Sequence, residues 1–192
     1  MFNLTSHHSL ENNYALGLLP QRNLKNSFYQ ETSSRSNLNN FSLSSENRRI
    51  LRKTDNFTYQ IFPIFYNLEI QKQIYQWLKI LKWNFPISSV KQIFTNHIFN
   101  YLYVWKIDQE IVAYSICYFS KNISHIAYVF YDPQYSHGDL PIRLVLQFII
   151  DSQQKKLKYA YLGRFSESTG FYKRNMPGFE YYSHGQWLKY SH

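Results

Sequence analysis

The chain has 192 residues, a length that suits one domain of ordinary size. Hydrophobic residues make up 44% and aromatic residues 19%, which is too much apolar surface for a disordered chain. The formal net charge of +9 favours a polyanionic partner such as RNA, because neutralising phosphates releases counterions. The basic residues are spread along the chain, so a solvated basic surface explains the charge equally well.

The rarity of cysteine excludes several kinds of site. Cys117 is the single cysteine, so neither an intrachain disulfide nor a cysteine-based zinc or iron–sulfur site can form. The seven histidines show no pairing at metal-ligand spacing, so no metal site is expected. Cys117 lies within an apolar run, which predicts a buried, inert thiol.

Targeting and membrane signals are missing from the sequence. Residues 1–13 are polar and lack the apolar core of a signal peptide. No run approaches the roughly 20 apolar residues that span a bilayer. We therefore expect a cytoplasmic protein with no membrane partner.

The first third of the chain carries weak structural signals. Residues 1–13 predict a loose tail, and the Ser- and Asn-rich stretch 30–47 predicts a loop or weak strand. Ser44 and Ser45 are candidate helix caps before a basic cluster, so a short turn of helix is expected there. These signals divide the chain into a basic N-terminal segment, 1–56, and a folded domain, 57–192.

Two helices and a group of strands are predicted next. Apolar residues recur at three- and four-residue spacing in 68–83, and Pro86 ends this helix. Ser88 or Ser89 is expected to cap a second helix with an apolar face extending to Ile98. The runs 101–107, 111–119 and 123–131 are dense in β-branched and aromatic residues, which predicts an antiparallel meander.

The last third predicts a helix followed by short elements. A helical apolar stripe runs from Leu140 to about Gln154, with Pro141 tolerated in its first turn. A strand over 158–163, a short helix over 168–174 and a final strand or hairpin over 179–190 follow. This order predicts an α/β (α+β) domain with a GNAT-like acyltransferase layout, a mixed, mainly antiparallel sheet flanked by helices.

Several blocks carry a family resemblance. Residues 127–135, Ala-Tyr-Val-Phe-Tyr-Asp-Pro-Gln-Tyr, resemble the strand-to-loop block of the arginyl-tRNA-protein transferases, which belong to the GNAT-like acyltransferases. Tyr161-Leu162-Gly163 is similar to that family's next strand. Other similar positions are Tyr14, Phe28-Tyr29 and Arg48-Arg49 in the N-terminal block, and Tyr172-Lys173, Phe179-Glu180 and Trp187 in the closing region.

The chain departs from the family pattern at two places. Where many members carry clustered cysteines, residues 30–35 read Gln-Glu-Thr-Ser-Ser-Arg. Where the family has Ser-Leu-Gly, residues 137–141 read His-Gly-Asp-Leu-Pro. Any metal or cluster of the family is therefore not carried over to this chain.

The resemblance implies an aminoacyl-tRNA-protein transferase that moves arginine or leucine from charged tRNA to the N-terminus of an acceptor protein. This is the chemistry of protein arginylation and N-degrons, and it uses charged tRNA as a co-substrate without a resident cofactor. Such transfer requires positioning, removal of a proton from the amine, and donors facing the developing oxyanion. In a GNAT-like sheet these groups gather where the strands splay after a block such as 123–131, with the loop 132–140 at the opening.

The candidate site residues follow from this layout. Asp132 and Glu167 are candidate general bases or partners of a cationic aminoacyl side chain, although a turn residue and a helix cap explain them equally simply. Tyr131 is a third catalytic candidate, as a donor or a stacking platform. Substrate-binding candidates are Tyr135, His137, Tyr161, Gly163, Tyr172 and Lys173. Candidates for holding tRNA phosphates are Arg48, Arg49, Arg52, Lys53 and Arg174.

Two other functions fit the same sequence. An acyl-CoA-dependent GNAT N-acetyltransferase would use acetyl-CoA, but residues 134–139 hold one glycine, out of register with the Arg/Gln-x-x-Gly-x-Gly/Ala pattern of those enzymes. A non-catalytic tRNA- or RNA-binding relative is favoured by the missing cysteines and the altered start of the helix after Asp139.

Overall fold

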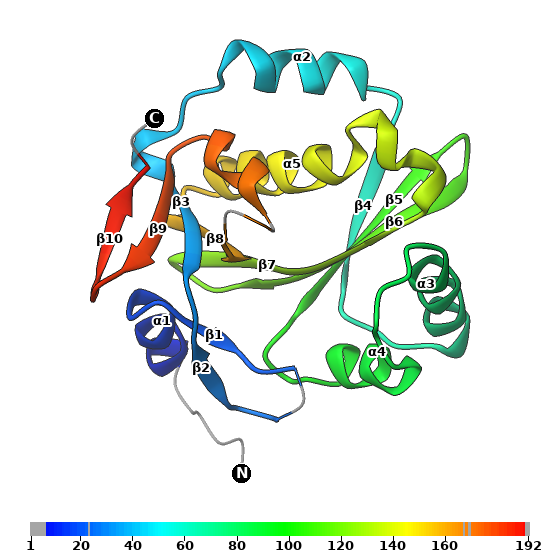
Figure 1. Ribbon diagram of the computed structural model, residues 1–192, viewed down its shortest axis with the longest axis horizontal. Helices are drawn as coiled ribbons and strands as arrows, with labels where there is room; N and C mark the ends of the chain where they lie inside the picture. Colours follow the sequence, from blue (N-terminus) through cyan, green and yellow to red (C-terminus); the bar gives the residue numbers. More distant parts are fainter. Residues whose placement is uncertain (1–6, 23, 167, 169, 191–192) are drawn as a thin grey trace.

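The computed structural model describes residues 7–22, 24–166, 168 and 170–190. At its centre lies an eight-stranded sheet in the order β10-β9-β3-β8-β7-β6-β5-β4 (Figure 1). Neighbouring strands are antiparallel except β7 and β8, which run parallel. The strands are β3 (Ser33–Asn37), β4 (Thr58–Pro63), β5 (Tyr101–Ile107), β6 (Glu110–Phe119), β7 (Ile123–Tyr131), β8 (Tyr159–Arg164), β9 (Phe179–Ser183) and β10 (Gln186–Lys189).

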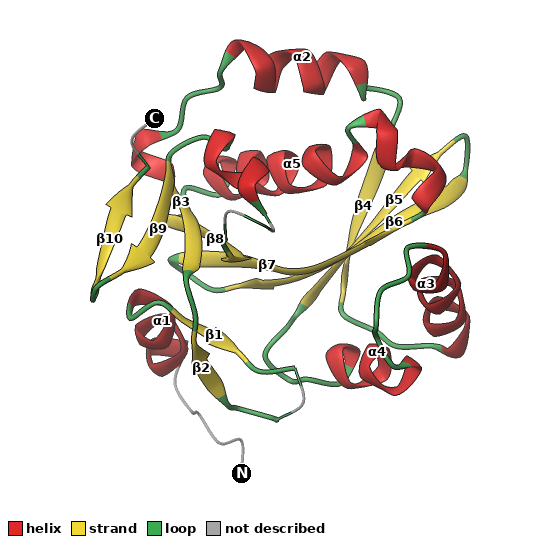
Figure 2. Cartoon of the chain, viewed as in Figure 1, coloured by secondary structure: helices red, strands yellow, loops and turns green. Residues whose placement is uncertain are grey.

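Helices cover both faces of this sheet (Figure 2). α5 (Leu140–Gln154) packs on one face, and α2 (Ser45–Lys53) lies outside α5. The other face carries α1 (His7–Ala15), a hairpin of β1 (Leu18–Pro20) and β2 (Phe28–Gln30), α3 (Leu68–Ile80) and α4 (Ile87–Phe94). The described chain also forms the 3-10 helices η1 (Leu38–Asn40), η2 (Pro133–Gly138) and η3 (Phe171–Asn175).

Each face of the sheet has its own apolar core. Leu144 and Phe148 of α5 are buried in the cluster on one face, and Ile74 and Ile93 of α3 and α4 are buried in the cluster on the other. Cys117 belongs to the first cluster and is fully buried, and burial raises the pKa of its thiol. The prediction of a buried thiol is thus confirmed.

From residue 68 onwards the predicted elements are confirmed within a few residues. The meander is β5, β6 and β7, and the long helix ends at Gln154 as predicted. α4 begins directly after Pro86, so Ser88 and Ser89 lie inside its first turn and do not cap it. The short helix predicted over 168–174 is the 3-10 helix η3, and the C-terminal hairpin is β9 and β10.

The first third is more ordered than the sequence predicts. The prediction of a loose tail is wrong for residues 7–13, which belong to α1, and Tyr14 of this helix is fully buried against Tyr118 and Tyr161. The helix predicted after Ser44 is confirmed as α2, with Ser44 and Asn47 forming a capping box. Tyr14 of α1 and Ile50 of α2 thus belong to the two apolar clusters that cover the sheet.

The Ser-rich strand β3 lies inside the sheet, between β8 and β9. Its Arg35 is buried, pairs with Glu180 of β9 at 2.7 Å, and lies between the rings of Tyr159 and Trp187 at 3.8 and 4.0 Å. A charged side chain is tolerated at this depth because its charge is paired and its flat faces contact aromatic rings.

Candidate active site

The sheet opens between its two parallel strands. β7 and β8 pair only at Ile123–Tyr159, Ser124–Ala160 and His125–Tyr161, although both strands continue beyond these pairs. The pairing of β7 with β6 skips Ala127, so a β-bulge lies at Ala127, two residues after His125. Bulges re-aim side chains and end strand pairing, and here the bulge coincides with the point of divergence. The opening therefore begins within residues 123–131, whereas the GNAT-like layout predicts it after this block.

Gly163 lies two residues past the last paired position of β8, with φ of +76°. A Cβ atom at this position would lie 3.9 Å from Nε2 of His125 and 4.0 Å from Nζ of Lys173. Both nitrogens therefore border the space that a side chain at residue 163 would occupy. We call this space, bordered by His125, Gly163 and Lys173, the Gly163 gap.

His125 lies at the inner end of the opening and is buried. Burial and the nearby charge of Lys173 lower the pKa of its ring to about 3, so the ring is neutral at physiological pH. Its Nδ1 lies 2.8 Å from the hydroxyl of Tyr14, whose proton is retained because burial raises the pKa of that hydroxyl. If Tyr14 donates, the ring proton lies on Nε2, which has no partner among the described residues.

Lys173 approaches the gap from η3. Its Nζ donates a 2.6 Å hydrogen bond to the carbonyl of Arg164, which leaves further N–H groups for a ligand. Burial lowers the pKa of its amine to about 8. At neutral pH the group is therefore mainly an ammonium, but one poised to lose its proton. A cationic donor beside an N–H of His125 forms an arrangement suited to a developing oxyanion.

A cavity of about 160 Å³ adjoins the gap. That volume equals about five water molecules at roughly 30 Å³ each, so it suits a small group. Its walls are mainly apolar or aromatic, and the β1–β2 hairpin closes one side with Leu19, Pro20 and Tyr29. Arg164 lies on its rim and pairs with Glu31 at 3.4 Å.

The outer end of the opening holds several predicted site residues. Tyr131 packs edge-on against Trp83. Tyr172 lies near Tyr131, and its burial together with this neighbour raises the pKa of its hydroxyl to about 12. Asp132 caps η2 by accepting a 3.0 Å bond from the backbone of Gln134. The strand from His125 to Asp132 spans about 20 Å, so this carboxylate lies at the mouth, far from the Gly163 gap.

The other predicted substrate-binding residues are dispersed. Tyr161 is buried in the core between Tyr14 and Trp187. Tyr135 is half-buried in η2 and contacts Phe57 edge-on, and His137 also belongs to η2. Glu167 lies outside the described residues. The structure thus brings Gly163 and Lys173 together at the gap and Tyr131 and Tyr172 together at the mouth.

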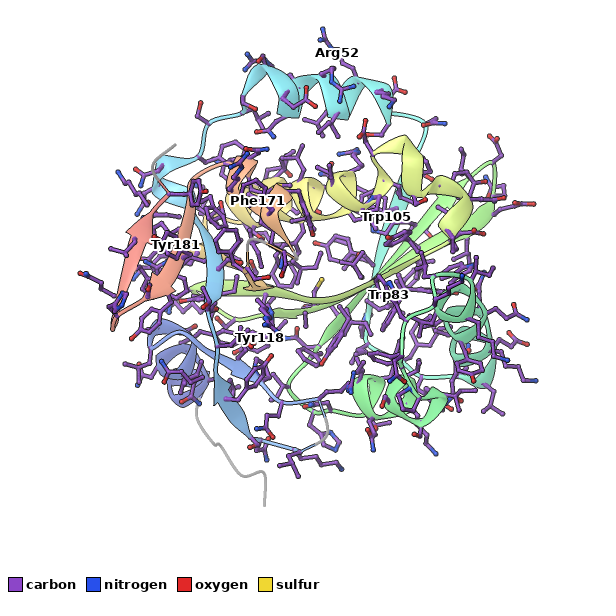
Figure 3. All side chains as sticks on the ribbon, viewed as in Figure 1. Arg52, Trp83, Trp105, Tyr118, Phe171 and Tyr181 are labelled. Atoms are coloured by element: carbon purple, nitrogen blue, oxygen red, sulfur yellow. The ribbon has the colours of Figure 1, made fainter. Side chains whose placement is uncertain are left out.

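The predicted phosphate-binding residues lie on the α5 side of the sheet. On α2, Arg49 pairs with Glu46 at 2.6 Å and with Asp139 at 3.4 Å, and Lys53 pairs with Asp139 at 3.0 Å. Arg52 points outward from the same helix (Figure 3). Arg48 donates to the carbonyl of Leu43, and Arg174 of η3 lies over the ring of Phe171 at 3.6 Å.

Sequence reasoning does not single out His125. It sits in a run of apolar residues, where a histidine most simply reads as a core side chain. Ser124 faces α5, because its hydroxyl hydrogen bonds Ser152 of that helix. Successive side chains of a strand point to opposite faces, so His125 lies on the face away from α5. The useful signal is therefore a histidine preceding the Tyr-Asp-Pro block by six residues, at the point where the strands part.

None of the helices in the described part of the chain is long and apolar enough to cross a membrane. Comparison of the sequence with family models and with curated proteins gives no match.

The fold is nevertheless similar to solved structures. FemX superposes with a TM-score of 0.57 at 12% identity, covering 91% of this chain and 66% of FemX. The C-terminal domain of a protein assigned as a lysylphosphatidylglycerol synthetase in Agrobacterium fabrum gives 0.51 at 14% identity, covering 83% of this chain and 51% of that one.

A third similar structure is a GCN5-related glucosamine N-acetyltransferase region of a fungal multi-domain GH3 β-N-acetylglucosaminidase. It gives a TM-score of 0.51 at 13% identity, covering 93% of this chain and 22% of that one. The chain thus spans about half the length of the Agrobacterium fabrum structure. These similarities confirm the predicted GNAT-like fold.

Proposed function

We propose that the protein is an aminoacyltransferase that moves an amino acid from charged tRNA to an amine, with the Gly163 gap as its reaction centre. Arginine or leucine as the amino acid and a protein N-terminus as the acceptor are the finer expectations drawn from the family resemblance. The observation that carries the proposal is the convergence of Lys173 Nζ and His125 Nε2 at a gap between splayed strands.

The proposed reaction needs no covalent enzyme intermediate. The acceptor nitrogen attacks the carbonyl carbon of the aminoacyl ester, a C–N bond forms, and the C–O bond to the ribose breaks. The proton released by the amine passes to the departing ribose oxygen, so the charges balance. Lys173 and His125 donate hydrogen bonds to the carbonyl oxygen while it carries negative charge, which lowers the barrier.

The direction of approach follows from charge. The phosphates of a tRNA are attracted to the basic residues of α2 and to Arg174, on the α5 side of the sheet. The acyl ester then reaches the gap past Tyr131, Asp132 and Tyr172 at the mouth, where these residues orient the terminal nucleotide. The amine acceptor approaches from the hairpin side, through the 160 Å³ cavity.

An acyl-CoA donor is the rival reading, and it shares the fold. Asp139 argues against it, because this residue has φ of +63° at the start of α5 and its carboxylate is held there by Arg49 and Lys53. A helix N-terminus attracts a pyrophosphate through its backbone N–H groups and dipole, and the negative charge of the Asp139 carboxylate would oppose that binding. A non-catalytic RNA binder is the third reading, and it makes no use of the Lys173–His125 pair.

The test is transfer of radiolabelled amino acid from a full set of aminoacyl-tRNAs to peptides with acidic, basic and neutral N-termini. Label is expected on at least one peptide, and a Lys173→Met variant should lower that rate by about a hundredfold or more. Acetyl-CoA with the same peptides is the parallel arm. Absence of transfer from every aminoacyl-tRNA would overturn the proposal, and acetylation would replace it by the rival reading.

A further inference from the structure

A second cavity, of about 390 Å³, lies on the α5 side of β4, β5 and β6, away from the Gly163 gap. This volume falls within the range of roughly 300 to 1,000 Å³ that is typical of ligand pockets. Its walls include Ile61, Tyr101, Phe119, Ser120, Lys121 and Lys155. We call it the Lys155 pocket.

The walls of the Lys155 pocket are fixed by hydrogen bonds. The side chain of Asn100 bonds both backbone groups of Phe119, at 2.8 and 2.9 Å. The backbone N–H of Lys158 donates to the carbonyl of Asn122 at 2.8 Å, which ties the β6–β7 turn to the segment after α5. The pocket is therefore largely preformed, which lowers the entropic cost of binding a ligand.

Positive charge is concentrated around this pocket. Four exposed lysines lie in the two tied segments: Lys121, Lys155, Lys156 and Lys158. None of them forms an ion pair with another residue in the described ranges. The negative C-terminal end of the α5 dipole favours positive charge at Lys155 and Lys156. It does not explain Lys121, which lies in a different turn, or Lys158, which lies beyond the helix.

Aromatic and apolar surface lies exposed beside these charges. Tyr101 and Ile61 are 38% and 39% exposed, and the ring of Phe119 packs edge-on against Tyr101 at 5.5 Å. The amine of Lys155 lies 5.9 Å from the centre of the Phe119 ring. Exposed aromatic and apolar surface next to cations suits a ligand that has both a π-face and negative charge, which is the chemistry of a nucleotide.

We propose that the Lys155 pocket binds one nucleotide of a single-stranded RNA segment, with its base against Tyr101 and Ile61 and its phosphates on Lys121 and Lys155. The positive charge of the whole chain attracts such a polyanion, and the pocket supplies the local contact. This inference does not rest on the proposed transferase activity, because it requires RNA binding only.

The position of the pocket gives it a separate role if the protein is a transferase. Asp139 and Lys155 flank the two ends of α5, and its 15 residues rise about 22 Å. The pocket therefore lies at the opposite end of α5 from Arg49 and Lys53, and none of its lining residues borders the Gly163 gap. It is expected to govern affinity for whole tRNA while leaving the chemistry of a minimal aminoacyl-adenosine donor unchanged.

The test measures the fluorescence anisotropy of a labelled eight-nucleotide RNA with the full chain. The salt concentration is varied between about 50 and 200 mM, where phosphate contacts make the affinity depend strongly on salt. Reversing two charges, in Lys121→Glu with Lys155→Glu, should flatten the log–log salt dependence by about 1.4, which corresponds to two phosphates. Tyr101→Ser should weaken binding about fivefold or more and leave the slope unchanged. Tyr101→Phe should bind as the unmodified chain does.

A matched control carries the same change in net charge elsewhere. Lys72 and Lys79 are exposed on α3, on the opposite face of the sheet, so Lys72→Glu with Lys79→Glu alters charge without touching the pocket. The inference fails if this control weakens RNA binding as much as the pocket variant does. It also fails if Tyr101→Ser leaves affinity unchanged, or if inorganic polyphosphate binds as tightly as RNA. If the unmodified chain binds the RNA but transfers no amino acid, that result counts against the proposed function alone.

Discussion

The hydroxyl of Tyr14 lies 2.8 Å from Nδ1 of His125, and this hydrogen bond joins α1 to the strand at which the sheet opens. The two residues are 111 positions apart, and both are buried. When Tyr14 donates its proton to Nδ1, the ring proton of His125 lies on Nε2, so Tyr14 acts on the Gly163 gap through His125. Tyr14 is in this sense a positioning residue.

Replacing Tyr14 by Phe tests this relationship. The variant keeps the ring packing but frees the tautomer of His125, so we expect the transfer rate to fall about tenfold while stability drops by about 1 kcal/mol. Tyr114→Phe is the control, because it loses a hydrogen bond of the same length to Gln73 away from the site. Equal loss of activity in both variants would show that Tyr14 acts through stability alone.

The pKa of Lys173 predicts a pH dependence. Burial lowers this pKa to about 8, so the ammonium is lost as the pH rises through 8, well below the usual range for lysine. If the ammonium stabilises the oxyanion, the rate constant for bound substrate falls above about pH 8. Single-turnover rates between pH 6 and 10 check this, and Lys173→Arg should keep partial activity without the fall. A rate that rises through pH 8 would assign Lys173 as a base instead.

The pKa of His125 predicts a pH dependence of stability. The folded ring has a pKa of about 3 and the unfolded ring one near 6.5, so the unfolded state binds more protons between these values. Stability therefore falls as the pH drops below 6.5, and at pH 5 this group alone costs about 2 kcal/mol. Urea unfolding at pH 5 and pH 8 measures the difference. His125→Gln should reduce it, whereas His184→Gln at the exposed β9–β10 turn should not.

The sequence predicts those parts of the fold whose signal is local. α3, α5 and the meander β5–β7 repeat apolar residues at the period of their own element, so each can be read without its neighbours. β3 has no such pattern: Arg35 is buried only because Glu180, Tyr159 and Trp187 converge on it from other strands. When those partners are unknown, a segment made of Ser, Arg and Asn predicts a loop or a weak strand.

The candidate site divides in the same way. Gly163 and Lys173 are identified through short motifs that lie close together in the chain. His125 joins them only because β7 and β8 are parallel and then diverge, a feature of pairing that no single segment encodes. Asp132 looks catalytic in the sequence because it follows the strand, but the length of β7 places it at the mouth.

Gly163 allows a controlled test of the gap. Gly163→Ala adds a Cβ at φ of +76° within about 4 Å of both site nitrogens, so it introduces backbone strain and also occupies the gap. Gly185 has φ of +77° but nothing within 4 Å of an added Cβ, so Gly185→Ala introduces the strain alone. Both variants should lose about 1 to 2 kcal/mol of stability, and only Gly163→Ala should lose most of its transfer activity. Equal activities would mean that the gap is not the reaction centre.

The Arg35–Glu180 pair predicts how strongly β3 is held in the sheet. Both side chains are 9% exposed, and Glu180 also accepts a 2.9 Å hydrogen bond from Asn37. Glu180→Ala leaves a buried guanidinium without its carboxylate, which should cost about 3 to 5 kcal/mol. Glu46→Ala breaks the exposed pair with Arg49 at a similar distance and should cost less than about 1 kcal/mol. Urea unfolding compares the two, and a small loss for Glu180→Ala would mean that the two aromatic rings suffice to hold Arg35 in place.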